Sequence, residues 1–154
     1  MMYSEIESIG EESGAIRCAE LHDNLAKLFG RWLFGSIKPS EADGISGFVE
    51  LSPRATVILI RKLAELSLDG SLPTLTIGFT EREMTLSVCN IEGIYLPEIA
   101  KLGILAGFEC NCFADGLELS CAVRQSVTMK IYAIKLAGLK RLFEEYFPED
   151  TPRG

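Results

Sequence analysis

The chain has 154 residues, of which 47% are hydrophobic, and a formal net charge of -7 at pH 7. This length and apolar content predict a folded domain with a real core and exclude an intrinsically disordered protein. The acidic balance argues against nucleic acid and anionic membrane as partners, because phosphate binding needs a basic surface.

Several features predict a cytoplasmic protein. No apolar run reaches membrane-spanning length, and the first residues, MMYSEIESIGEES, lack the basic and apolar regions of a secretory signal. Five cysteines, an odd number with no Cys-x-x-Cys pair, fit a reducing compartment. They are Cys18, Cys89, Cys110, Cys112 and Cys121. Cys110-x-Cys112 with the lone His22 is not a recognised zinc pattern, so we expect no metal and no cofactor.

The first strongly patterned stretch runs from Ala15 to about Phe34, after a weakly patterned start over residues 1–13. Apolar residues recur there with a 3-4-3-4 spacing, which predicts an amphipathic helix with one hydrophobic seam. The seam consists of Cys18, Leu21, Leu25, Leu28 and Trp32. Such a seam packs either on the domain's own sheet or on the helix of a second subunit. The pattern alone leaves both possibilities open.

The next stretch changes from loop to buried helix. Residues 35–46, GSIKPSEADGIS, are typical of a loop or linker. Phe48–Leu51 has the composition of a short strand, and Ser52-Pro53 is typical of a helix N-cap followed by proline at the first position. The helix that follows, ending at Asp69-Gly70, is apolar over most of its circumference, which predicts burial against a sheet.

At Thr74 the hydrophobic period changes to two. Apolar and polar residues alternate over Thr74–Thr80 and again over Met84–Val88, on both sides of a charged break. This pattern predicts an antiparallel hairpin with one buried face. A second helix is expected to start at Leu96-Pro97 and to end at Gly107 or at Phe113.

The last third of the chain repeats this plan. Alternation returns over Leu117–Val123 and Val127–Ala133, which predicts a second hairpin, and Leu136–Phe147 has the pattern of a closing helix. We therefore predict an α/β (α+β) sandwich, with a mixed, mostly antiparallel sheet covered by helices on one face and preceded by the amphipathic helix. The expected organisation is a helical segment over residues 1–36 and a domain over residues 47–148.

This order of elements resembles the ATP-binding domain of the GHKL superfamily, which includes gyrase, MutL and the histidine kinases. The stretch VELSPRATVILIRKLAELSLDG resembles the strand, capped helix start and long helix that open the kinase catalytic domain. LTIGFTEREMTLSVCNIEGI resembles its central hairpin, and DGLELSCAVRQSVTMKIYAI resembles its closing strands. Upstream, AELHDNL (Ala19–Leu25) is similar to the phosphoacceptor box on the first dimerisation helix of one kinase subfamily.

The resemblance also implies that ATP is not used. Arg61 and Glu65 stand where kinases carry a glutamate and the magnesium-binding asparagine. Asn90 replaces the adenine-reading aspartate, Glu92 replaces a nearby glycine, and the glycine-rich phosphate lid is missing. Phosphoryl transfer from ATP depends on positioning and charge neutralisation, so these losses predict a pseudo-kinase.

Two functions follow as expectations. In the first, the protein acts in two-component signal transduction: His22 accepts a phosphoryl group from the receiver domain of a response regulator, with Asp23 or Glu20 orienting the imidazole. The hydrophobic seam is then a possible homodimer interface. The alternative is a non-catalytic, kinase-derived scaffold that binds a partner through its sheet edge or its helical seam. An exposed His22 on a dimeric helix bundle favours the first function, and a His22 packed into the core excludes it.

Overall fold

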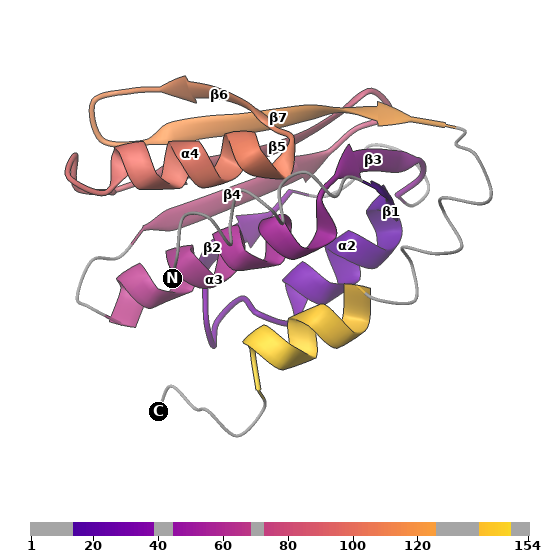
Figure 1. The fold of residues 1–154 in the computed structure, drawn as a ribbon, viewed down its shortest axis with the longest axis horizontal. Helices are drawn as coiled ribbons and strands as arrows, with labels where there is room; N and C mark the ends of the chain where they lie inside the picture. The colour runs from indigo at the N-terminus through magenta and orange to yellow at the C-terminus, as the bar shows by residue number, and fades with distance from the viewer. Residues whose placement is uncertain (1–13, 39–44, 69–72, 126–138, 149–154) are drawn as a thin grey trace.

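The computed structural model describes residues 14–38, 45–68, 73–125 and 139–148 (Figure 1). Seven strands form one open sheet in the order β1-β3-β7-β5-β4-β2, with β6 paired to β7 outside this path. The strands are β1 (Gly14–Arg17), β2 (Phe34–Ile37), β3 (Phe48–Leu51), β4 (Thr74–Phe79), β5 (Glu83–Cys89), β6 (Glu109–Cys112) and β7 (Leu117–Arg124). The β2–β4 pair is parallel and the other pairs are antiparallel. The predicted mixed, mostly antiparallel sheet is confirmed.

The helices of the described part are α2 (Cys18–Ala26), α3 (Pro53–Leu68), α4 (Leu96–Ala106) and a last helix over residues 139–146. Figure 1 shows α3, α4 and the last helix on the same side of the sheet. Within the described residues, none of the helices is long and apolar enough to span a membrane.

The buried helix and the central hairpin agree with their sequence patterns. Ser52 caps α3, because its Oγ accepts a hydrogen bond from the Ala55 amide at 3.2 Å. β4 and β5 pair in antiparallel register, with Ile77 opposite Leu86. These two side chains are at most 1% exposed, whereas most alternate residues of both strands are polar.

The end of α4 is decided by a glycine. Gly107 is the C-cap, with a left-handed φ of 118°, and its amide donates to the carbonyls of Gly103 and Ile104. A side chain at this φ is strained, so glycine is the residue that ends the helix here. The chain then enters β6. This strand lies in the stretch between Gly107 and Phe113, where the sequence pattern did not decide the end of the helix.

The predicted amphipathic helix is wrong at both ends. Residues 15–17 belong to β1, which pairs with β3, and α2 ends at Ala26. Gly30, with a φ of 85°, then lies in a tight turn. β2 follows in a stretch predicted to be a loop. The apolar spacing therefore continues past the helix because turn residues and a strand also face the core.

The hydrophobic seam is core. Its side chains are 0% to 6% exposed within a single chain: Cys18, Leu21, Leu25, Leu28 and Trp32. The structure thus packs these side chains inside one chain, where they contact its own core. The described part of residues 1–36 also places two strands in the common sheet.

The second hairpin is described only in part. β7 forms as predicted, and it lies between β5 on one side and β3 with β6 on the other. Its predicted partner strand, Val127–Ala133, lies outside the described residues, as do residues 1–13 and the first three residues of the predicted closing helix. Residues 139–146 of that helix are helical as predicted.

Candidate functional site

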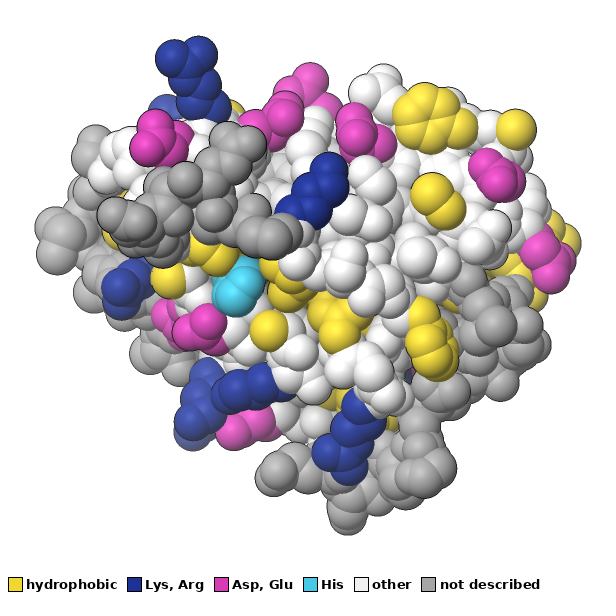
Figure 2. All heavy atoms as spheres, turned by 180° about the vertical axis from the view of Figure 1, so that it is seen from behind, with side chains coloured by type: hydrophobic (Ala, Val, Ile, Leu, Met, Phe, Trp, Pro, Cys, Tyr) yellow, Lys and Arg dark blue, Asp and Glu magenta, His cyan; other side chains and the backbone are white. Residues whose placement is uncertain are grey.

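His22 lies half-buried on α2 and keeps 30% of its side chain exposed. Its ring packs edge-on against Phe79 at the end of β4, with ring centroids 6.0 Å apart. Figure 2 shows the imidazole at the surface, between hydrophobic side chains. Packing on Phe79 restricts the orientation of the ring while one edge stays in contact with solvent.

Asp23 is the carboxylate that contacts this ring. His22 Nδ1 lies 3.2 Å from Asp23 Oδ1, and the Asp23 side chain is 75% exposed. Glu20, the other carboxylate expected to orient the ring, lies on the opposite flank of α2, because helical residues two apart point about 200° apart. Burial raises the pKa of Glu20, with Arg17 acting in the opposite direction and Asp23 in the same one. The structure thus pairs His22 with Asp23 and separates it from Glu20.

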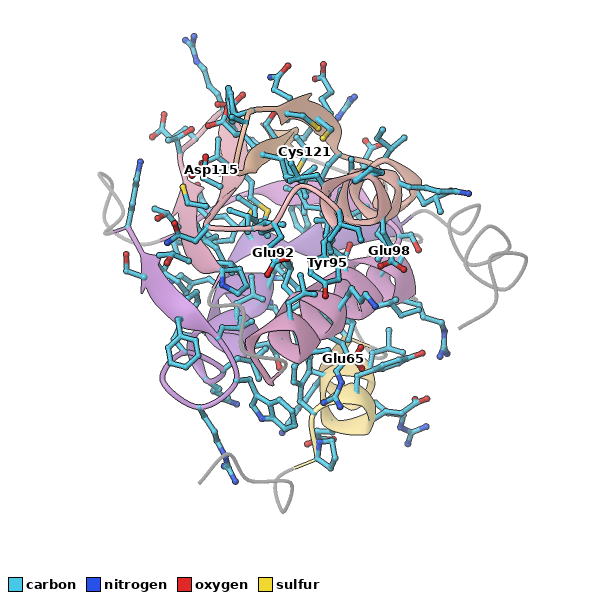
Figure 3. The ribbon with its side chains drawn as sticks, turned by 90° about the vertical axis from the view of Figure 1, so that its left-hand side faces the viewer. Glu65, Glu92, Tyr95, Glu98, Asp115 and Cys121 are labelled. Atoms are coloured by element: carbon cyan, nitrogen blue, oxygen red, sulfur yellow. The ribbon has the colours of Figure 1, made fainter. Side chains whose placement is uncertain are left out.

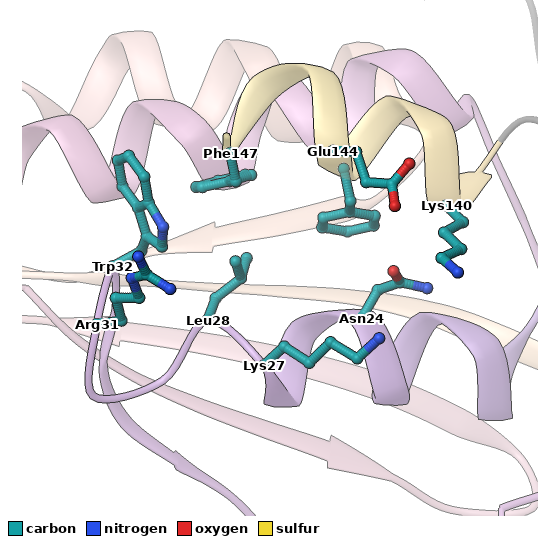
Figure 4. A pocket seen from close by; sticks show the side chains of 9 residues that line it. Asn24, Lys27, Leu28, Arg31, Trp32, Lys140, Glu144 and Phe147 are labelled. Carbon is teal, nitrogen blue, oxygen red and sulfur yellow. The ribbon is translucent and has the colours of Figure 1, made fainter. Parts of the chain in front are cut away.

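The other flank of α2 borders an open groove of about 740 Å³ between α2, the turn that follows it and the last helix (Figure 4). We call it the basic groove. Its lining residues are Asn24, Lys27, Leu28, Arg31, Trp32, Lys140, Phe143, Glu144 and Phe147. A concave site of this volume falls in the range of ligand-binding pockets, about 300–1,000 Å³.

Aromatic rings form the floor of the basic groove. Trp32 meets Phe147 edge-on with centroids 5.2 Å apart, and Phe147 stacks on Phe143 at 6.2 Å. From beneath, the guanidinium carbon of Arg61 lies 4.7 Å from the centroid of Trp32. These contacts fix the rings, so the floor is rigid and already formed.

The rim of the basic groove carries opposite charge to the protein as a whole. Lys27 and Arg31 stand on one wall, and Lys140 stands with Glu144 on the other. Figure 4 shows Lys140 and Glu144 on the last helix facing Asn24 and Lys27. Three cationic side chains against one carboxylate make this surface basic, although the chain is acidic.

The positions that the resemblance assigns to nucleotide binding are occupied by contacts within the protein. Arg61 Nε donates to Glu65 Oε2 at 3.2 Å, and its Nη1 donates to the carbonyl oxygen of Tyr146 in the last helix, also at 3.2 Å. Asn90 is in the left-handed region, with a φ of 61°, and its side-chain amide donates to Thr74 Oγ1 at 3.4 Å. Glu92 is exposed.

Figure 3 shows this side of the molecule, where Glu65, Glu92 and Glu98 are all visible with Tyr95. Glu98 pairs with Lys62 at 3.4 Å and so joins α4 to α3. Glu65 pairs with Arg61 in the same way, so both carboxylates are engaged by cations of α3.

In the part of the chain that the structure describes, no three His, Cys, Asp or Glu side chains gather in a way that would hold an ion. His22 therefore does not join Cys110 and Cys112 in a common cluster.

Comparison with protein-family models and with curated protein sequences gives no match.

Sequence reasoning found His22 and missed the basic groove. A signal was present in part: Asn24, Lys27, Leu28 and Arg31 follow the spacing of one helical face. Lys140 and the two phenylalanines lie more than a hundred residues further along the chain, so only the packing of the last helix brings them to this face.

Proposed function

We propose that this protein is a non-catalytic binding module whose basic groove holds an acidic segment of a partner protein. The observation that carries this proposal is the groove itself, with three cationic side chains around a preformed aromatic floor. Aromatic and arginine side chains are enriched where proteins bind one another, and fixed rings lose little entropy on binding.

Charge decides the class of partner. A protein of net charge -7 repels acidic chains over most of its surface. An acidic segment is therefore expected to bind only at the local basic site. The apolar floor, whose aromatic residues keep 3% to 6% of their surface exposed, can be covered by a hydrophobic side chain that stands between the acidic ones. Lys27 and Lys140, from opposite walls, would meet the carboxylates of that segment.

Trp32 makes the test direct, because it is the only tryptophan of the chain and lies in the groove floor. The probe is a synthetic peptide in which glutamates flank a leucine-phenylalanine pair, titrated while the tryptophan fluorescence is recorded. We expect a saturable change that weakens as salt is added, because exposed charges are screened over about 10 Å at 0.1 M. A peptide with glutamines in place of the glutamates is expected to bind at least about tenfold more weakly.

The matched variants separate the groove from general charge. Lys27→Glu combined with Lys140→Glu is expected to abolish the fluorescence change. Lys38→Glu reverses the charge of another exposed lysine, which lies beside Gly78 on the sheet. This variant is expected to keep the fluorescence change. Equal binding of both peptides, or equal binding by all variants, contradicts the proposal.

A second candidate function rests on a different observation, the contact between His22 and Asp23. We propose here that His22 accepts a phosphoryl group from the receiver domain of a response regulator. The Nδ1 proton of a neutral ring is donated to Asp23, which leaves the Nε2 lone pair to attack phosphorus. The N–P bond forms as the P–O bond of the aspartyl phosphate breaks, and the receiver carboxylate leaves. The Asp23 carboxylate supports the positive charge that then develops on the ring.

The test is transfer of labelled phosphate from phosphorylated receiver domains to the full chain without ATP. We expect labelling of the wild type, none of His22→Ala, and slower labelling of Asp23→Asn, which keeps the shape of the side chain but removes its charge. If His22→Ala labels as well as the wild type, or if no receiver labels either protein, this candidate is wrong. In either case the peptide titration of the basic groove is unaffected.

We also propose a cytoplasmic location. All five cysteines are free, and Cys89 and Cys112 are exposed to solvent. Exposed thiols persist in a reducing compartment and are oxidised outside it, which supports this location.

A further inference from the structure

Cys110 and Cys112 form a pair of neighbouring thiols on β6. Residues two apart on a strand point to the same face, and both cysteines lie opposite leucines of β7, Leu119 and Leu117. Their sulfur atoms are 3.9 Å apart. Cys112 is exposed and Cys110 is half-buried against the core, so one thiol is held while the other stands at the surface.

A disulfide fits this geometry poorly. Two residues along a strand are separated by about 6.7 Å, which is the upper limit of the Cα–Cα distance that a disulfide spans. Joining the sulfurs would distort β6 and its pairing with β7, and strained disulfides are readily reduced. The pair is therefore set up to remain two thiols.

We propose that Cys110 and Cys112 bind a soft monovalent metal ion, Cu(I), as a two-sulfur site. Two metal–sulfur bonds of about 2.3 Å span about 4.6 Å in line. The sulfurs lie 3.9 Å apart, so rotation of the exposed Cys112 side chain is enough to place the ion between them without moving the strand. Thiolates select soft ions such as Cu(I). Structural zinc needs four ligands, and the described residues offer no cluster of three or more that would supply them.

Binding is a substitution without redox change. Each thiol loses its proton, two Cu–S bonds form, and the product is a bis-thiolate complex with two protons released to solvent. Because two protons are released for each ion bound, affinity is expected to increase with pH.

The other cysteines offer no comparable site. Cys18 and Cys121 are buried, and burial raises the pKa of Cys121 to about 12. Cys89 is exposed at the end of β5 and provides a matched control, a thiol of similar accessibility that belongs to neither the pair nor β6.

The experiment is an anaerobic competition between the full chain and a chromophoric Cu(I) chelator, with proton release measured in parallel. We expect one Cu(I) per chain and two protons released per ion. Cys112→Ser and Cys110→Ser are each expected to weaken binding by more than about tenfold, since even outer-shell changes at metal sites cost that much. Cys89→Ser is expected to bind like the wild type.

Circular dichroism of each variant tests whether the fold is retained. Cys112→Ser is expected to disturb the fold least, because Cys112 is exposed. Absence of Cu(I) uptake by the wild type overturns the proposal. So does a folded Cys112→Ser variant that binds as tightly as the wild type, or a Cys89→Ser variant that loses binding to the same extent.

Discussion

Arg61 connects three parts of the molecule through one side chain. Its guanidinium stacks on Trp32 and Phe147, forms an ion pair with Glu65 and donates to the Tyr146 carbonyl. The resemblance assigns this position to nucleotide chemistry, but here its charge holds the last helix onto α3. Such a planar, always charged group is suited to stacking and hydrogen bonding at once.

Arg61→Ala is expected to destabilise the protein by about 2 kcal/mol, because it removes a cation–π contact and a charge-assisted hydrogen bond to a backbone carbonyl. Arg61→Lys keeps the charge but not the planar stack, so about 1 kcal/mol is expected. Urea denaturation monitored by Trp32 fluorescence measures the loss of stability in both variants. If Arg61→Ala unfolds at the wild-type urea concentration, the arginine does not anchor the last helix.

At the scale of elements, α2 shows how a helical pattern is used by a globular core. Its buried residues, Cys18, Leu21 and Leu25, are all 0% exposed, and the half-buried His22 lies beside them. The helix is shorter than its pattern because Leu28 and Trp32 reach the core from a turn. This arrangement places the basic groove on one flank of α2 and His22 on the other.

Leu25→Asp is expected to unfold the protein, since an unpaired charge in the core costs on the order of 4 kcal/mol or more. Ala26→Asp, one residue along the same helix, changes an exposed side chain and is expected to remain folded. Sedimentation and circular dichroism distinguish the outcomes. A Leu25→Asp protein that is soluble and fully folded would mean that the seam is not core.

β2 pairs in parallel with β4 and depends on a glycine at their contact. Gly35 has a φ of 131°, and a Cβ there would collide with the carbonyl of Leu75 in β4. Gly30 also has a positive φ, 85°, but faces open space. Substitution of Gly35 therefore adds a steric collision to backbone strain, whereas substitution of Gly30 adds backbone strain alone.

Gly35→Ala is expected to cost about 3 kcal/mol, from strain and the displacement of β2, whereas Gly30→Ala costs about 1 kcal/mol from strain alone. Thermal unfolding of both variants provides the measurement. Similar melting temperatures for the two would show that β2 does not pack on β4 as described.

At the scale of the whole molecule, charged side chains of α3 fasten neighbouring helices. Lys62 pairs with Glu98 of α4, and Arg54 lies 3.8 Å from Glu145 of the last helix. The exposed pairs contribute little stability each, about 0–1 kcal/mol, but they orient the helices around the buried α3. The charged side chains of α3 are thereby used for joining elements.

Titration of the full chain with Mg-ATP is expected to give no heat of binding. Glu65 and Arg61 bind each other, and Asn90, which the resemblance aligns with the adenine-reading aspartate, donates to Thr74. A histidine kinase catalytic domain measured under the same conditions serves as the positive control. Micromolar binding of Mg-ATP by this chain would show that these contacts do not exclude the nucleotide.

Elements with a local periodic pattern could be predicted from the sequence alone. The capped, apolar α3, the β4–β5 hairpin and the alternation of β7 were all predicted, because burial on one face or on all faces leaves a periodic signal. His22 and Asp23 were predicted as neighbours because they are adjacent on one helix, and the structure pairs them.

Only the tertiary structure decided the rest. Four-residue strands such as β1 and β2 carry too few residues for a period to be read, and their pairing with β3 and β4 depends on partners far along the chain. The apolar seam was ambiguous because a core and a dimer interface select the same side chains. In the structure these side chains are buried within one chain. The basic groove could not be predicted from the sequence, because Lys27 and Lys140 approach each other only when the last helix packs beside α2.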